Sequence, residues 1–169
     1  QDSLVRCALC REGEDVLLVT KQGKSIRFAE SGVRQVGRAA RGVVGIRFSE
    51  DEDRVIGLEV IPPNSESTIL SVCENGFGKR TPQVEYRQQS RGGKGIYTIK
   101  VTSRNGPVVG ISQVDSGDHL MLMTSSGKLM RFTMEEVGVI GRVTQGVRLI
   151  KLEKNEKVMS FSKVPMDEE

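Results

Sequence analysis

The stretch Gly23-Lys24-Ser25-Ile26-Arg27-Phe28 decides the fold, because it recurs along the chain. It returns as Gly127–Phe132 (GKLMRF), and Gly76–Thr81 (GFGKRT) lies between these two copies. The glycines that open the three copies are 53 and 51 residues apart. A regular period of this length is typical of arrays and propellers, in which one supersecondary unit is repeated.

A second recurring element keeps the same spacing. Gly37–Gly42 (GRAARG), Ser90–Gly95 (SRGGKG) and Gly141–Gly146 (GRVTQG) are basic, glycine-containing segments, and each precedes an apolar run that ends in an isoleucine and a basic residue. A final apolar run closes each unit. These elements predict repeats at residues 15–61, 67–114 and 118–164, with 1–14 as the end of a preceding repeat and 165–169 as the start of an acidic tail.

Each repeat is expected to contain four short strands. In the first repeat we expect them at 16–21, 24–28, 43–48 and 54–61, separated by turns rich in Gly, Ser and Asp. No long segment has a helical period. The sequence therefore predicts an all-β, propeller-like fold in which residues 1–169 form a single partial domain of three four-stranded antiparallel blades, stacked because one blade cannot bury both faces alone.

Charge is unevenly distributed within each repeat, although the net charge of the chain is only +3. Residues 21–48 and 79–104 each carry seven basic residues and one acidic residue, and 128–151 carry five and two. The segments between them are all acidic. Equivalent positions of stacked blades lie on one rim, so we expect a curved basic stripe suited to a phosphate backbone. The alternative is an ordinary solvated charged face.

Recurrent arginines are the main candidates for phosphate contact, because a guanidinium donates two parallel hydrogen bonds. Arg27, Arg80 and Arg131 share one repeat position, but they could instead pair with acidic neighbours across a blade. Gln145 replaces the basic residue of the other two repeats, so we expect the third repeat to contribute least. The candidate DNA contacts are Arg27, Arg34, Arg38, Arg41, Lys79, Arg80, Arg91, Lys94, Arg131 and Arg142.

Gln89–Gly95 (QSRGGKG) resembles the gyrase A box, a loop of glutamine, basic residues and glycines. Glu74–Thr81 and Ile140–Val147 also resemble late blades in the C-terminal domain of the DNA gyrase A protein. Ser90 stands where the box has a basic residue, so this loop is box-like rather than the box itself. The resemblance implies the last three blades of a β-pinwheel that wraps duplex DNA on its rim.

The resemblance also implies the partners and the chemistry. We expect the partners to be double-stranded DNA, the rest of the gyrase A protein, and gyrase B within a heterotetramer. The domain itself is expected to be non-catalytic within an ATP-dependent type IIA topoisomerase. No cofactor is expected in this chain, since ATP and Mg belong to other parts of the holoenzyme. The expected location is the cytoplasm, at the nucleoid.

Other functions remain as alternatives. The chain could be the equivalent C-terminal domain of topoisomerase IV, or a protein-binding propeller module. Cys7 and Cys10 form a C-x-x-C, but the repeat places both at inward apolar positions and only one histidine is present, so we expect no metal site. No apolar run approaches the ~20 residues that span a bilayer, so we expect no membrane partner.

Overall fold

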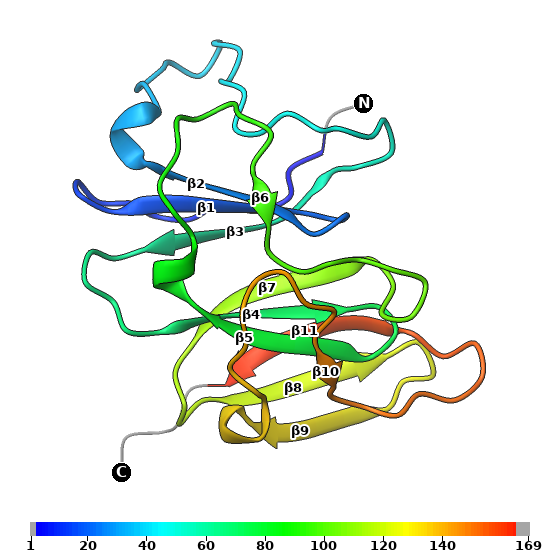
Figure 1. The fold of residues 1–169 in the computed structure, drawn as a ribbon. Coiled ribbons are helices and arrows are strands. Elements are labelled where there is room, and N and C mark those ends of the chain that lie inside the picture. Colours follow the sequence, from blue (N-terminus) through cyan, green and yellow to red (C-terminus); the bar gives the residue numbers. More distant parts are fainter. Residues whose placement is uncertain (1–2, 165–169) are drawn as a thin grey trace.

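The computed structural model describes residues 3–164, which form three antiparallel β-sheets arranged one after another (Figure 1). The only helical segments in this part of the chain are three short 3-10 turns, so the all-β prediction is confirmed. The first repeat contains β1 (Asp15–Thr20), β2 (Lys24–Ala29), the turn Glu30–Gly32 and β3 (Val55–Ile61). The second contains β4 (Thr68–Cys73), β5 (Phe77–Pro82), the turn Gln83–Glu85, β6 (Ile96–Tyr97) and β7 (Val108–Val114). The third contains β8 (His119–Thr124), β9 (Leu129–Thr133), the turn Met134–Glu136, β10 (Val147–Arg148) and β11 (Val158–Val164).

Each of the first two sheets is completed by a strand from the following repeat. The strand orders of the three sheets are β3-β1-β2-β6, β10-β5-β4-β7 and β11-β8-β9. The short strand β6 of the second repeat therefore completes the first sheet, where Ile96 pairs with Ser25. In the same way β10 of the third repeat completes the second sheet, where Val147 pairs with Gly78. Each junction between repeats is thus made by backbone hydrogen bonds as well as by side-chain packing.

This pairing between repeats shows that one predicted strand was wrong. The segment 43–48 was predicted to pair within the first repeat, but it forms no strand in the described structure. Its counterparts β6 and β10 pair with the second strand of the preceding repeat, and residues 3–164 contain no such strand for 43–48. For the same reason the third sheet has three strands in this part of the chain, and the edge of β9 is exposed, with Leu129 62% accessible.

The glycine that opens each recurring stretch allows this close junction. Gly23 and Gly76 have φ values of 78° and 80°, a left-handed conformation that a side chain disfavours. A Cβ at Gly23 would overlap the carbonyl oxygen of Ile99, and one at Gly76 would lie 2.7 Å from that of Ile150. Gly127 has the same conformation, with a φ of 81°, but a Cβ there would meet nothing within 4 Å.

Apolar side chains from adjacent repeats form shared cores. One cluster joins Leu17, Val19 and Ile61 of the first repeat to Ile69 and Ile99 of the second, and all of them are buried. A second cluster joins Leu70 and Val72 of the second repeat to buried side chains of the third, including Leu120, Leu122 and Ile150. Packing is close where sheets meet, since a Cβ at Gly57 would lie 2.6 Å from the Ile111 side chain.

Residues Leu4–Cys10 belong to the segment 1–14 that was expected to end a preceding repeat, and their structure differs from that of the runs that end the other repeats. The runs equivalent to them, β3, β7 and β11, each pair with the first strand of their own repeat. Leu4–Cys10 forms no strand, and Cys7 and Cys10 are exposed rather than inward-facing. Within the described residues no first strand lies ahead of this segment to receive it. The expected acidic tail, 165–169, lies outside the described residues.

Candidate DNA-binding surface

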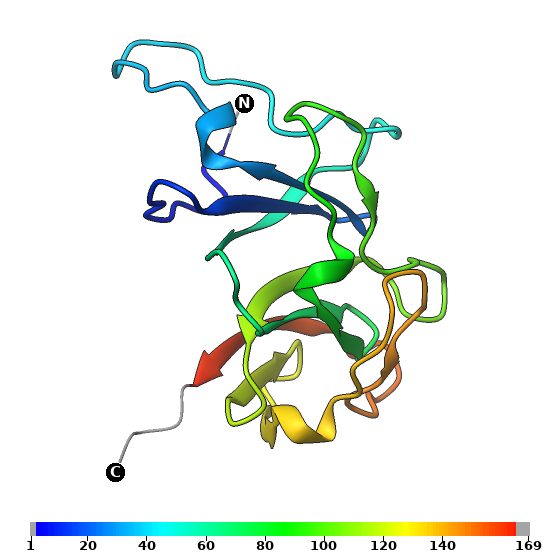
Figure 2. The ribbon, with the colours of Figure 1, turned by 60° about the vertical axis from the view of Figure 1, so that its left-hand side comes forward.

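The three basic loops, residues 34–42, 90–95 and 141–146, lie one after another along the stacked repeats (Figure 2). The loop of the second repeat is fastened to the first, because Arg91 donates from Nε to the carbonyl oxygen of Gly32 at 2.8 Å and from Nη1 to that of Val44 at 2.6 Å. The loop of the third repeat is fastened to the second, because Arg142 Nη1 donates to the carbonyl oxygen of Tyr97 at 2.8 Å. Repeat symmetry thus places the loops in a continuous row.

Arg91 and Arg142 occupy equivalent positions and make equivalent contacts. Val44 and Tyr97 are also equivalent, so each arginine ties its loop to the same backbone site of the preceding repeat. Both side chains are half-buried. The two residues therefore join adjacent repeats and leave only part of each guanidinium exposed for another ligand.

Arg27 and Arg80 hold the repeats together at a second site. Arg27 forms an ion pair with Asp15 at 2.6 Å, and its Nη1 donates to the carbonyl oxygen of Tyr86 at 3.4 Å. Arg80 donates from Nε to the carbonyl oxygen of Val137 at 2.9 Å and is only 6% exposed. Tyr86 and Val137 are equivalent in the repeat. The structure thus gives Arg27 and Arg80 partners within the protein.

Lys79 is the candidate whose burial is most complete. Its side chain is inaccessible to solvent, and its ammonium contacts the third basic loop from beneath. A phosphate cannot reach Lys79 there, and it cannot reach the buried Arg80 either. We therefore leave Lys79 and Arg80 out of the DNA-contacting set, together with Arg27, whose guanidinium is paired with Asp15.

The remaining candidates are exposed. Arg34, Arg38, Arg41, Lys94 and Arg131 all face solvent. Arg131 occupies the position of Arg27 and Arg80, but its contact in the described structure is a hydrogen bond to His119 Nδ1 at 3.2 Å. The first basic loop therefore exposes three arginines, and the third exposes fewer basic side chains.

Sequence reasoning missed one set of exposed basic residues, although the repeat carried the signal. Arg47, Lys100 and Lys151 follow the recurrent isoleucines, and all three are exposed. The isoleucines themselves are buried, so each pair places an apolar side chain in the core next to a cation in solvent. The recurrent isoleucine–basic pair therefore marks an outward-facing cation in each repeat.

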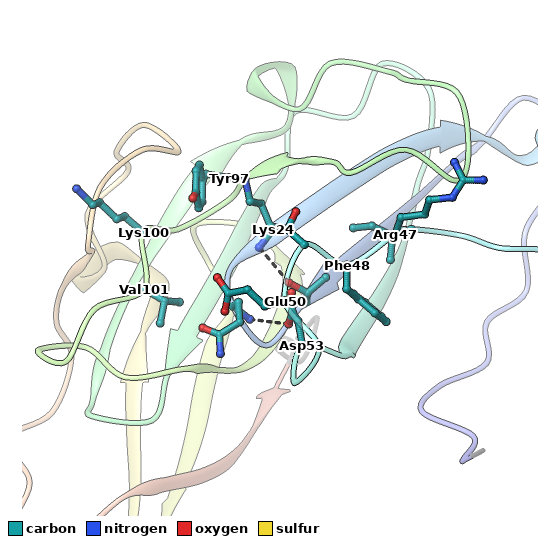
Figure 3. A pocket seen from close by; sticks show the side chains of 12 residues that line it. Lys24, Arg47, Phe48, Glu50, Asp53, Tyr97, Lys100 and Val101 are labelled. Atoms are coloured by element: carbon teal, nitrogen blue, oxygen red, sulfur yellow. Dashed lines mark hydrogen bonds between the residues drawn. The ribbon is translucent and has the colours of Figure 1, made fainter. Parts of the chain in front are cut away.

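A hollow of about 140 Å³ lies between the first and second repeats (Figure 3). Arg47 and Lys100 line it and point outward on opposite sides. Lys24 Nζ lies 3.5 Å from the centre of the Tyr97 ring, a cation–π contact that holds the lysine at the rim. Glu50 and Asp53 also line the hollow, so its charge is mixed.

The Asp53 side chain anchors the acidic turn that follows the first basic loop to the turn between β1 and β2. Asp53 Oδ1 accepts hydrogen bonds from the amides of Gln22 and Arg54, each at 2.9 Å.

Among the described residues, no group of three or more His, Cys, Asp or Glu side chains is placed to hold a metal ion. No helix in residues 3–164 is long and apolar enough to cross a membrane.

Comparison with known proteins agrees with the repeat architecture. The family model described as "DNA gyrase C-terminal domain, beta-propeller" matches residues 14–62, 68–115 and 118–165. The chain is 44% identical over 170 residues to the DNA gyrase A protein of Salmonella typhimurium, covering 99% of this chain and 19% of that protein. It is also 44% identical over 163 residues to the DNA gyrase A protein of Staphylococcus epidermidis, covering 96% and 18%. The chain thus spans about a fifth of the length of these curated relatives.

Solved structures show the same fold. A DNA gyrase A C-terminal domain superposes with a TM-score of 0.77 at 28% identity, over 89% of this chain and 50% of that one. The C-terminal domain of DNA topoisomerase IV superposes with a TM-score of 0.82 at 22% identity, over 90% and 47%, which shows a shared fold. The predicted resemblance is confirmed: the chain belongs to the DNA gyrase C-terminal domain family.

Proposed function

We propose that this chain binds duplex DNA along its row of basic loops and bends the DNA around the stacked repeats, as a non-catalytic part of a gyrase A protein. The observation that carries the proposal is the row of loops itself, in which Arg91 seats the second loop on the first repeat and Arg142 seats the third loop on the second repeat. The proposed contacts are the exposed cations Arg34, Arg38, Arg41, Arg47, Lys94, Lys100, Arg131 and Lys151, with the exposed parts of Arg91 and Arg142.

The chemistry of these loops fits the phosphate backbone rather than the bases. Lys and Arg contacts to phosphate position a protein on a duplex without reading its sequence. Aromatic side chains, on which single-stranded bases stack, are scarce in the chain at 4%. Smooth bending of 20–30 bp by 40–90° costs on the order of 1–6 kcal/mol. Several phosphate contacts on a curved row can offset that cost.

Membership of the family supports a proposal for the setting of this activity. We infer that the chain works with the rest of the gyrase A protein and with gyrase B, at the nucleoid in the cytoplasm. ATP and Mg would act in those other parts, and the wrapped DNA would be presented for strand passage that introduces negative supercoils. The chain's own contribution would be mechanical, since it would fix the path of the DNA.

A topological assay tests wrapping directly. A relaxed closed-circular plasmid is incubated with the chain, treated with a nicking-closing topoisomerase, stripped of protein and analysed for linking number. We expect a shift that grows with the amount of bound protein. A mobility shift of a short duplex at low salt is run in parallel. Binding without a change in linking number would remove the wrapping claim, and a folded chain that binds no duplex would favour the protein-binding module.

A further inference from the structure

Lys79 is a buried cation whose hydrogen bonds all go to one loop. It lies on β5 of the second repeat and has no accessible surface. Its Nζ donates to the carbonyl oxygens of Gly141 and Arg142 and, at 3.2 Å, to Thr144 Oγ1. These acceptors all lie in the third basic loop. Although Lys79 was a candidate DNA contact in the sequence, it therefore faces the underside of that loop.

Packing alone does not explain a lysine at this position. The equivalent residues of the other repeats are Ile26 and Met130. Ile26 is fully buried, and its Cδ1 lies 3.5 Å from the point that a Cβ atom would occupy at Gly93. An apolar side chain can therefore support the loop at that junction. A buried ammonium loses its hydration, and no ion pair with a carboxylate is present for Lys79 in the described structure. Burial of the Lys79 ammonium therefore costs free energy that an apolar side chain would not cost. This cost indicates that the charge has a role that an apolar side chain cannot fill.

The hydrogen bonds of Lys79 change what the loop presents to solvent. They hold two successive carbonyl oxygens, those of Gly141 and Arg142, against the buried ammonium, so these oxygens do not direct their partial negative charges toward a bound phosphate. Other contacts complete the loop: Thr81 Oγ1 donates to the carbonyl oxygen of Ile140 at 2.9 Å, and the amide of Arg142 donates to Glu85 Oε2 at 3.1 Å. Lys79 supplies the central support between these two anchors.

We propose that Lys79 is a positioning residue that holds the loop Gly141–Thr144 with its carbonyls inward, so that Arg142 can meet a DNA phosphate. The proposal rests on the proposed function, because it assigns Lys79 a role within DNA binding. It also gives the third repeat, which has Gln145 where the other repeats have a basic residue, a means of keeping one phosphate contact.

The surroundings of Lys79 make its charge testable by pH. Burial lowers the pKa of Lys79 to about 8, with the neighbouring Arg142 guanidinium acting in the same direction and the Glu85 carboxylate opposing it. Burial raises the pKa of the nearby Cys73 thiol to about 12 and also raises the pKa of Tyr86, so neither group loses its proton near pH 8. A neutral amine has two N–H donors in place of three. The loop therefore loses support as the pH rises through about 8.

The experiment measures the salt dependence of duplex binding for the wild type, Lys79→Met, Arg142→Ala and the double variant. Each lost phosphate contact lowers the log–log salt slope by about 0.9. We expect Lys79→Met and Arg142→Ala each to lose about one contact, and the double variant to lose no more. We also expect the wild-type slope to fall between pH 7 and pH 9, and the slope of Lys79→Met to stay constant. Lys79→Ile, which copies the first repeat, serves as a second variant if Lys79→Met fails to fold.

Each outcome separates this proposal from the proposed function. A Lys79→Met variant that binds like the wild type at pH 7 would overturn the positioning role, as would a double variant that loses two contacts. An Arg142→Ala variant with an unchanged slope would also overturn it, while DNA binding through the other loops would stand. If the wild type binds no duplex, the proposed function itself fails.

Discussion

Glu156 shows how a single buried carboxylate orders a turn. It precedes β11 and is only 7% exposed. It accepts hydrogen bonds from Thr124 Oγ1 at 2.7 Å, from the Ser126 hydroxyl and from the amide of Glu153 at 2.8 Å. These donors lower the pKa of Glu156 to about 2, and Lys128 Nζ, 3.4 Å away, acts in the same direction. The charged form is therefore the one that the folded state favours.

We expect Glu156→Gln to destabilise the protein in a pH-dependent way. A carboxyl with a depressed pKa contributes stability above its ordinary value near 4.5, and this contribution is lost as the pH falls towards about 2. The variant should unfold at lower urea concentration than the wild type at pH 7, and the difference should shrink between pH 4.5 and pH 2.5. Glu153→Gln is the control, because the Glu153 side chain is 80% exposed. An equal difference at both pH values would contradict this account.

Gly23 and Gly127 form a matched pair for testing the junction between repeats. Alanine at either glycine is strained by about 1–2 kcal/mol, because both have positive φ. At Gly23 the new methyl group also meets the Ile99 carbonyl, which adds about 1–3 kcal/mol of overpacking. We expect Gly23→Ala to lower the free energy of unfolding clearly more than Gly127→Ala in urea titrations. Similar losses in the two variants would mean that the junction next to β6 can accommodate a methyl group beside the Ile99 carbonyl.

At the scale of elements, the recurrent arginines act as ties between neighbouring repeats. We expect Arg80→Ala to cost about 1.5–3 kcal/mol of unfolding free energy, because it removes a charged donor from the buried carbonyl of Val137. Arg131→Ala at the equivalent exposed position should change stability by no more than about 0.5 kcal/mol. Chemical denaturation of both variants makes the comparison. Equal effects would show that Arg80 does not tie the repeats together.

The sequence predicted most strands but not their partners. The strands β1, β2 and β3 follow from local apolar runs and glycine turns, which depend on near neighbours in the chain. The pairing of Ser25 with Ile96 could not be predicted in this way, because it joins residues of different repeats. The roles of Arg27 and Arg80 were hidden for the same reason. Their carbonyl partners, Tyr86 and Val137, lie in the next repeat and carry no signal in the side-chain sequence.

At the scale of the whole molecule, the repeats form a quasi-one-dimensional stack in which each unit contacts its neighbours. The period of the sequence was enough to predict three units and a basic segment in each. It could not show which cations face solvent, because equivalent positions differ: Arg80 is buried, whereas Arg131 is exposed. Exposure depends on whether a following repeat covers the position. The candidate DNA surface therefore leaves out buried basic residues such as Arg80 and includes exposed ones, such as Arg47 and Lys100, that sequence reasoning missed.

The most direct test of the central claim is a salt titration of duplex binding with two triple variants of equal charge change. Arg34, Arg38 and Arg41, all exposed on the first basic loop, are replaced by alanine in one variant. In the other, alanine replaces the exposed cations Arg11, Arg54 and Lys154, which lie outside the three loops. We predict that the first variant loses up to about 2.7 from the log–log salt slope, while the second keeps the wild-type slope. Equal losses in both variants, or a wild-type slope near zero, would contradict a DNA-binding surface built from the basic loops.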